Sequence, residues 1–90
     1  MQLTKHAQTR MQQRGITENI LDLLYTYGRH VERGSAGALL HFDKRARELI
    51  RKSTSRKEYA RIEQKLNAYI VEAADGSVVT VGYRYKPVHA

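Results

Sequence analysis

The sequence predicts an α+β domain in which an amino-terminal helix pair and basic helices pack on a small antiparallel sheet. Three observations favour this class. Asp75-Gly76 lies between two segments of alternating apolar residues, the strongest short hairpin signal in the chain. Apolar residues recur at helical spacing in the first 28 residues and again after Lys44. The chain has 90 residues, too few for a second hydrophobic core, so we expect a single domain spanning 1–90.

The first helix is predicted over residues 5–14. Ala7 and Met11 recur at helical spacing, Thr4 can cap the start, and Gly15 suits a left-handed stop. Thr17 is the natural cap of a second helix that ends at Gly28 and whose apolar face comprises Ile20, Leu21, Leu23, Leu24 and Tyr27.

Two short strands, 29–33 and 38–42, are expected to flank the loop Gly34-Ser35-Ala36-Gly37. The basic stretch that follows predicts two helices, because Ser55 and Glu58 match a capping box after a break at Ser53-Thr54-Ser55.

A final hairpin is predicted from strands 68–73 and 78–85 around a two-residue turn. This turn would pair Val71 with Thr80 and Tyr69 with Gly82. Two side-chain sets would then occupy opposite faces: Tyr69, Val71, Thr80 and Arg84 on one, and the more apolar Ile70, Val79, Val81 and Tyr83 on the other.

The charge is positive and uneven. The chain has 16 Lys+Arg against 9 Asp+Glu, a formal charge of +7, and residues 44–65 alone hold nine basic and three acidic residues. Such a run is either a solvated helical face or an electrostatic footprint for nucleic acid or an acidic protein.

The composition excludes several classes of site. There is no cysteine, so disulfide frameworks, zinc fingers, iron–sulfur ligation and thiol nucleophiles are ruled out. The four histidines fall in four different segments, so we expect no metal site and no cofactor. The amino terminus resembles no signal peptide and no stretch is long and apolar enough for a membrane helix, so we expect a cytoplasmic protein without a membrane partner.

Three residues of the first helix form the most informative local feature. His6, Arg10 and Arg14 lie at i, i+4 and i+8 and therefore on one side of the helix. A histidine beside two arginines suits metal-free phosphodiester cleavage, with the 2′-hydroxyl of RNA as nucleophile. A surface histidine in a basic helix is the alternative.

Other residues suit nucleic-acid contacts. Thr80 and Arg84 of the last strand are candidates for the same catalytic surface. Candidate nucleic-acid-binding residues are Lys44, Arg47, Arg51 and Lys52 of the basic stretch, together with the aromatic Tyr83 and Tyr85.

The opening segment, His6-Ala7-Gln8-Thr9-Arg10-Met11-Gln12-Gln13-Arg14-Gly15-Ile16, resembles a bacterial domain-of-unknown-function family numbered 4258, which also closes with an Asp-Gly hairpin and a Thr-bearing strand. That family is similar to RelE/ParE-like and BrnT-like toxins and to the barnase, colicin and RelE-like ribonuclease folds. The resemblance implies an active surface that combines the first helix with the last strands, that is His6, Arg10, Arg14, Thr80 and Arg84.

We therefore expect a toxin-like, metal-independent endoribonuclease of a toxin–antitoxin or related system. Its implied partners are RNA, free or ribosome-associated, and an acidic antitoxin protein. The alternative is a non-catalytic basic module that binds nucleic acid or an acidic protein partner. The sequence leaves open whether the protein is an enzyme, and ParE-like relatives act on gyrase instead.

Overall fold

The computed structural model describes residues 2–84 and confirms the α+β class. Its elements in chain order are β1 (Gln2–Leu3), α1 (Lys5–Arg14), α2 (Glu18–Tyr27), β2 (Arg29–Glu32), the 3-10 helix η1 (Gly34–Ala36), β3 (Ala38–His41), α3 (Lys44–Ser53), α4 (Arg56–Ile62), the 3-10 helix η2 (Glu63–Asn67), β4 (Ala68–Glu72) and β5 (Ser77–Tyr83).

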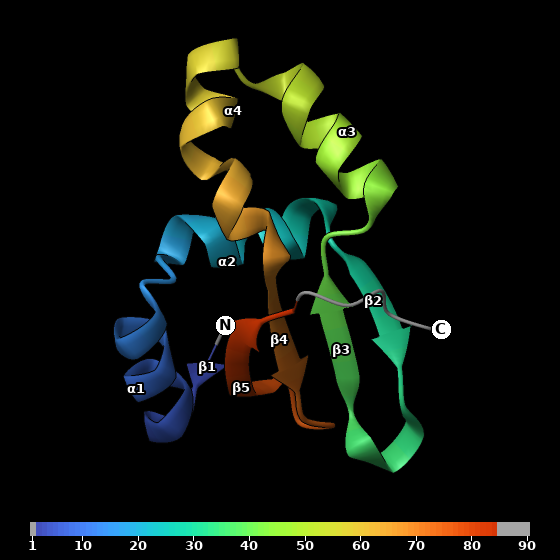
Figure 1. The fold of residues 1–90 in the computed structure, drawn as a ribbon. Helices are drawn as coiled ribbons and strands as arrows, with labels where there is room; N and C mark the ends of the chain where they lie inside the picture. The colour runs from blue at the N-terminus through green and yellow to red at the C-terminus, as the bar shows by residue number, and fades with distance from the viewer. Residues whose placement is uncertain (1, 85–90) are drawn as a thin grey trace.

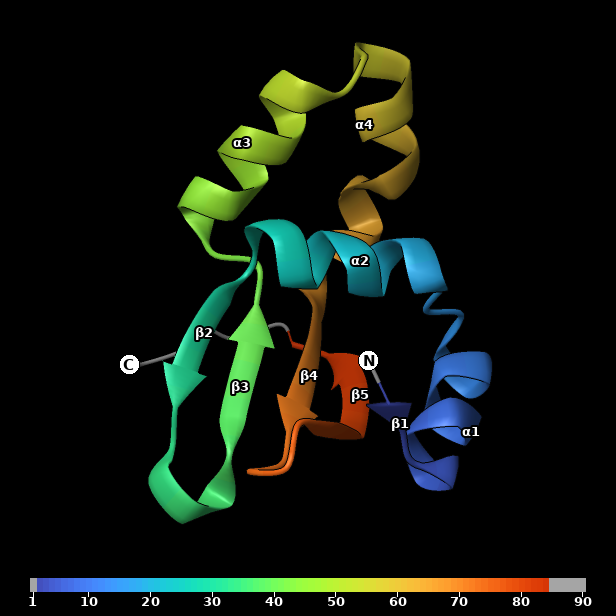
Figure 2. The same ribbon diagram turned by 180° about the vertical axis from the view of Figure 1, so that it is seen from behind.

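The five strands form one sheet in the order β1-β5-β4-β3-β2. All neighbours are antiparallel except β1, which runs parallel to β5. Helix α2 lies behind the strands in Figure 1 and in front of them in Figure 2, while α3 and α4 form a hairpin that projects beyond one end of the sheet. No helix within residues 2–84 is long and apolar enough to cross a membrane.

The helix ends follow the capping residues of the sequence. The Thr4 hydroxyl accepts the Ala7 N–H at 3.2 Å, and Gly15 ends α1 at a φ of +64°. The Ser55 hydroxyl accepts the Glu58 N–H at 3.1 Å, which confirms two helices rather than one in the basic stretch. Strand β1 was not predicted, because its two residues give no periodic signal and their pairing with β5 is long-range.

The final hairpin has the predicted register but not the predicted turn. Val71 pairs with Thr80 and Tyr69 with Gly82, as expected. The connecting loop, however, is one residue longer, because Ala73 donates its N–H to the Ser77 carbonyl at 2.8 Å. A bulge in the β4–β5 ladder, where Glu72 pairs with Val78, restores the register.

The bulge also corrects one assignment of side chains to faces. Val78 is fully buried in the core, whereas Val79, which the simple alternation placed there, is only half-buried. The expectation for Val79 was therefore wrong, because an extra residue in a strand interrupts the two-residue period.

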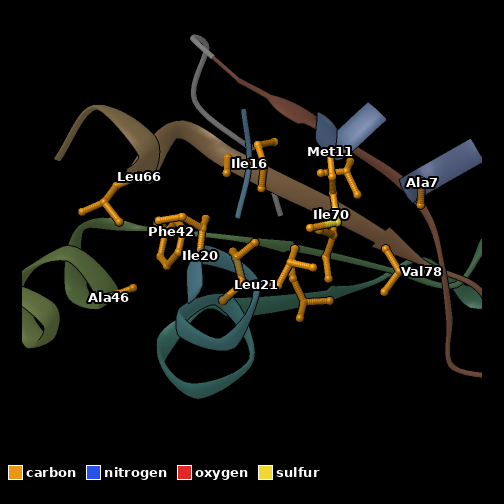
Figure 3. Close-up of a cluster of buried hydrophobic side chains, with 14 of the residues drawn as sticks. Ala7, Met11, Ile16, Ile20, Leu21, Phe42, Ala46, Leu66, Ile70 and Val78 are labelled. Atoms are coloured by element: carbon orange, nitrogen blue, oxygen red, sulfur yellow. The ribbon is translucent and has the colours of Figure 1, made fainter. Parts of the chain in front are cut away.

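One face of the sheet is covered by helices and forms the core. Figure 3 shows side chains from helices and strands meeting there. The sheet contributes Ala38, Leu40, Phe42, Ala68, Ile70, Val78 and Val81, and the helices contribute Ala7, Met11, Ile20, Leu21, Leu24, Ala46 and Ile50.

The opposite face of the sheet carries the residues that alternate with the core set, and we call it the open face. It is the side turned toward the viewer in Figure 1, and no helix within residues 2–84 lies across it. Its members are Arg29 and Val31 of β2, Leu39 and His41 of β3, Tyr69 and Val71 of β4, and Thr80 and Gly82 of β5. The name refers only to the absence of a described helix over this face, since Leu39 is buried there at 1% exposure.

Candidate nucleic-acid interface

A basic and aromatic row crosses the open face at one end of the sheet. Arg29 pairs with His41, His41 with Tyr69, and Tyr69 with Gly82. Side chains that face each other across neighbouring strands are about 5 Å apart at their β-carbons. The three strands β2, β3 and β4 therefore bring a guanidinium, an imidazole and a phenol side by side, although Tyr69 is far from the other two in the sequence.

Arg84 follows β5 and adds a second guanidinium to this row. Its N–H donates to the Asn67 carbonyl at 2.7 Å, which fixes the backbone. Its guanidinium carbon lies 5.6 Å from the centroid of the Tyr69 ring, a cation–π contact. Its Nε is buried and has no hydrogen-bond partner within residues 2–84. A buried N–H without an acceptor is unfavourable, so an anion that reached this donor would form a favourable hydrogen bond with it.

Gly82 makes room for the Tyr69 ring. A β-carbon at position 82 would lie 3.0 Å from Cε1 of Tyr69 and 3.2 Å from its hydroxyl oxygen. The ring thus lies close over the backbone of β5, which explains a glycine within an otherwise regular strand. Its position under Arg84 depends on that close approach.

The electrostatics of the row favour a neutral imidazole. Burial lowers the pKa of His41 below its ordinary value of 6.5, and the cations of Arg29 and Arg84 lower it further. The Asp43 carboxylate acts in the opposite direction without cancelling them. A histidine that stays neutral near pH 7 can accept a proton, and the two guanidinium groups beside it can hold a phosphate.

The row has no carboxylate cluster of the kind that binds metals. Among residues 2–84 no group of three or more His, Cys, Asp or Glu side chains is placed to hold a metal ion. The chemistry that these residues can supply is anion binding, stacking on an aromatic ring and proton transfer by an imidazole.

The predicted catalytic residues are divided between two parts of the molecule. Thr80 lies on the open face beside Val71, and Arg84 adjoins the same face. Helix α1, which carries His6, Arg10 and Arg14, instead packs Ala7 and Met11 into the core on the other face.

The start of α1 is also distant from Arg84 along the sheet. The Thr4 N–H donates to the Val78 carbonyl, so α1 begins level with Val78, six residues before Arg84. At about 3.3 Å per residue this is a separation of roughly 20 Å. The structure therefore does not bring His6 together with Arg84.

The polar stripe of α1 has no internal role in the described part of the chain. His6 and Arg14 are exposed and Arg10 is half-buried. Within residues 2–84 none of the three forms a hydrogen bond or an ion pair. The far end of α1 lies nearer the row, because Gly15 adjoins Lys65, whose ammonium is 5.8 Å from the centroid of the Tyr83 ring.

The residues predicted to bind nucleic acid differ in their availability. Lys44 and Lys52 are exposed on α3. Arg51 is exposed but bonded to Glu48 at 2.9 Å. Arg47 already forms two intramolecular hydrogen bonds, because its Nη2 donates to the Leu66 carbonyl at 2.8 Å and to Asn67 Oδ1 at 2.9 Å. Of the two tyrosines, Tyr83 packs against the core, and Tyr85 lies outside the described residues.

Sequence reasoning missed His41 and Arg29 as site residues. The alternation of His41 with Leu40 and Phe42 was visible and placed His41 on the face opposite the core. What was missing was the strand order, since only the pairing of β3 with β4 sets His41 beside Tyr69. Comparison of the chain with family models, with curated proteins and with solved structures found no match.

Proposed function

We propose that this protein is a toxin-like, metal-independent endoribonuclease whose active surface is the open face. One observation carries the proposal: His41 pairs with Arg29 and with Tyr69 across the sheet, its pKa is lowered by burial and by Arg29 and Arg84, and Arg84 lies over the Tyr69 ring with a buried Nε that has no acceptor within residues 2–84. Guanidinium groups bind phosphate through charge-assisted hydrogen bonds, and both arginines act electrostatically on His41.

The proposed reaction uses the 2′-hydroxyl of the RNA as nucleophile. His41 accepts the 2′-hydroxyl proton as the oxygen attacks the adjacent phosphorus. Arg29 and Arg84 stabilise the charge on the phosphate oxygens. The bond to the 5′-oxygen then breaks, that oxygen takes a proton from water, and the hydroxide so formed takes the proton from the His41 imidazolium. The products are a 2′,3′-cyclic phosphate and a 5′-hydroxyl. Tyr69 offers a ring on which a neighbouring base stacks.

The sequence supports the same function. The chain is strongly basic, and its opening motif from His6 to Ile16 resembles family 4258 and, through it, the RelE/ParE-like and BrnT-like toxins. Ribosome-associated RNA as substrate and an acidic antitoxin as partner belong to the proposal through this resemblance. We assign the role of general base to His41 instead of His6, because His41 is the histidine on which Arg84 acts.

The proposal is tested with His41→Gln and the matched variant His6→Gln. Removing a general base costs about 10²- to 10⁴-fold in rate, so we expect His41→Gln to lose cleavage of a short RNA by that factor. His6→Gln should retain most of the activity. Cleavage should survive a chelator and leave a cyclic phosphate. Equal activity in wild type and His41→Gln would refute this site, and loss in His6→Gln alone would move it to α1.

A second candidate is a non-catalytic binding module that uses the α3–α4 hairpin. Five exposed cations of this hairpin form no ion pair within the described chain: Lys44, Arg45, Lys52, Arg56 and Lys57. Under this alternative, charge reversal at Lys52 should abolish binding of a partner, whereas His41→Gln should have no effect on it.

A further inference from the structure

Helix α3 exposes an apolar side chain in the middle of its basic surface. Leu49 is 41% exposed and is the only large hydrophobic residue that is exposed among residues 2–84. Its apolar neighbours on the same helix, Ala46 and Ile50, are fully buried in the core. Leu49 therefore contributes little to the core and is available to a partner.

The surroundings of Leu49 on the helix are cationic. Residues three and four positions apart on a helix are neighbours, and those of Leu49 are Arg45, Ala46, Lys52 and Ser53. Ala46 is buried and Ser53 is uncharged, so the charged neighbours are Arg45 and Lys52. Both are exposed, and neither has a carboxylate partner within the described chain. An apolar side chain is thus held between two free positive charges.

A shallow groove lies beside Leu49 and Arg45 of α3. It runs between the end of α2 and the start of α3 and is lined by Thr26, Tyr27, Gly28, Arg29, Asp43, Arg45 and Leu49. Tyr27 and Leu49 provide apolar surface, while Arg29 and Arg45 provide positive charge. The acidic Asp43 is engaged as the cap of α3, where its carboxylate accepts the Ala46 N–H at 2.8 Å.

We propose that this groove binds an acidic protein segment that places one apolar side chain against Leu49 and carboxylates on Arg45 and Arg29. Guanidinium groups pair with carboxylates through two parallel hydrogen bonds, which suits the charge of the rim. The apolar centre is the reason to choose a protein, since a nucleic-acid backbone offers no aliphatic side chain to fill it. The side of α3 that carries Glu48 and Arg51 is less suited to phosphate, because the Glu48 carboxylate lies beside Arg51 there.

Occupation of the groove has a consequence for the open face. Arg29 lines the groove and also pairs with His41 in the β2–β3 ladder. A segment bound to Arg29 therefore competes with RNA at the end of the active row. This consequence rests on the proposed ribonuclease function, whereas the binding itself does not.

The experiment uses two glutamate-rich peptides of equal length and charge, one with a central leucine and one with serine in its place. Burial of a leucine side chain at the groove should strengthen binding about tenfold or more. In a fluorescence titration with wild-type protein, we expect the leucine peptide to bind tighter by that factor. In Leu49→Ser the two peptides should bind alike, and Ala60→Ser, an exposed change on α4, should behave as wild type.

Two results would overturn the proposal. The first is equal affinity of the two peptides for wild-type protein. The second is that Leu49→Ser weakens binding of a short RNA and not of the leucine peptide, which would make this flank a nucleic-acid surface. Because Leu49 lies outside the open face, RNA cleavage by Leu49→Ser should remain at the wild-type level. Failure of the docking proposal is thus distinguishable from failure of the ribonuclease proposal.

Discussion

Arg84→Met should raise the stability of the free protein or leave it unchanged while weakening RNA binding. In the free protein the Arg84 Nε is buried without an acceptor among residues 2–84, and its charge acts on His41, whose pKa it lowers. Methionine keeps an aliphatic stem over the Tyr69 ring and removes both unfavourable features. A residue that is retained for ligand binding is expected to show this opposition between stability and function.

The magnitudes follow from the contacts of Arg84. An unpaired buried donor costs roughly 1–3 kcal/mol, and the cation–π contact with Tyr69 is worth about 0.5–2 kcal/mol. The substitution should therefore change the free energy of unfolding by between about −1 and +2.5 kcal/mol, with the middle of that range on the stabilising side. In the complex, Arg84 would donate charge-assisted hydrogen bonds worth about 1.5–3 kcal/mol, so RNA affinity should fall by roughly 10- to 150-fold.

Urea unfolding and fluorescence anisotropy with a short single-stranded RNA measure the two effects on the same samples. An NMR titration adds a third readout, because loss of the Arg84 cation should raise the pKa of His41. A loss of more than about 1 kcal/mol in stability with unchanged RNA affinity would refute the reasoning. Arg84 would then be a structural residue.

Three further predictions concern stability. Tyr25→Phe should destabilise the protein by about 1–2 kcal/mol in urea unfolding, because it leaves the half-buried Glu72 carboxylate without the hydroxyl that donates to it at 2.6 Å. Gly37→Ala should lower the free energy of unfolding by more than about 2 kcal/mol, because a β-carbon there would lie 1.9 Å from the Glu72 carbonyl oxygen. In the matched variant Gly34→Ala the new β-carbon meets no atom within 4 Å, so the loss should be only about 1 kcal/mol, for its φ of +61°. Similar losses in the two variants would contradict this explanation. Because the pKa of His41 is lower in the folded state than in the unfolded state, the contribution of the neutral imidazole to stability is present above pH 6.5 and is lost as the pH falls below that value. Wild type should therefore lose stability relative to His41→Gln between about pH 7 and pH 5.

The elements with strong local signals were predictable. Thr4 and Gly15 delimit α1 at the predicted residues, and Ser55 separates α3 from α4 through its bond to the Glu58 N–H. These signals act over three or four residues, so they survive whatever packs against the helix. The predicted boundaries of strands β2 and β3 likewise lie within one residue of the observed boundaries.

The hairpin at Asp75-Gly76 shows how a correct register can follow from an incorrect turn. The loop has one residue more than predicted, and the bulge in β5 compensates for it, so Thr80 still pairs with Val71. Sequence alternation alone does not reveal a bulge, because Val78 and Val79 are chemically identical and either could enter the core. Packing against Leu3 and α1 selects Val78.

The candidate site depends on the lateral order of the strands, which neither capping signals nor residue alternation reveals. His6, Arg10 and Arg14 attract attention because a helix groups them within nine residues, and such grouping is visible in one dimension. His41, Tyr69 and Arg84 span 44 residues and meet only because β3 lies beside β4 and β4 beside β5. Nothing local to His41 distinguishes it from a histidine on a solvated strand. Its depressed pKa arises from burial and from Arg29 and Arg84, which lie on a neighbouring strand and beyond the end of another. A sheet face flanked by such charges can therefore supply a candidate site histidine that the local sequence does not mark, even where that sequence offers a more conspicuous one.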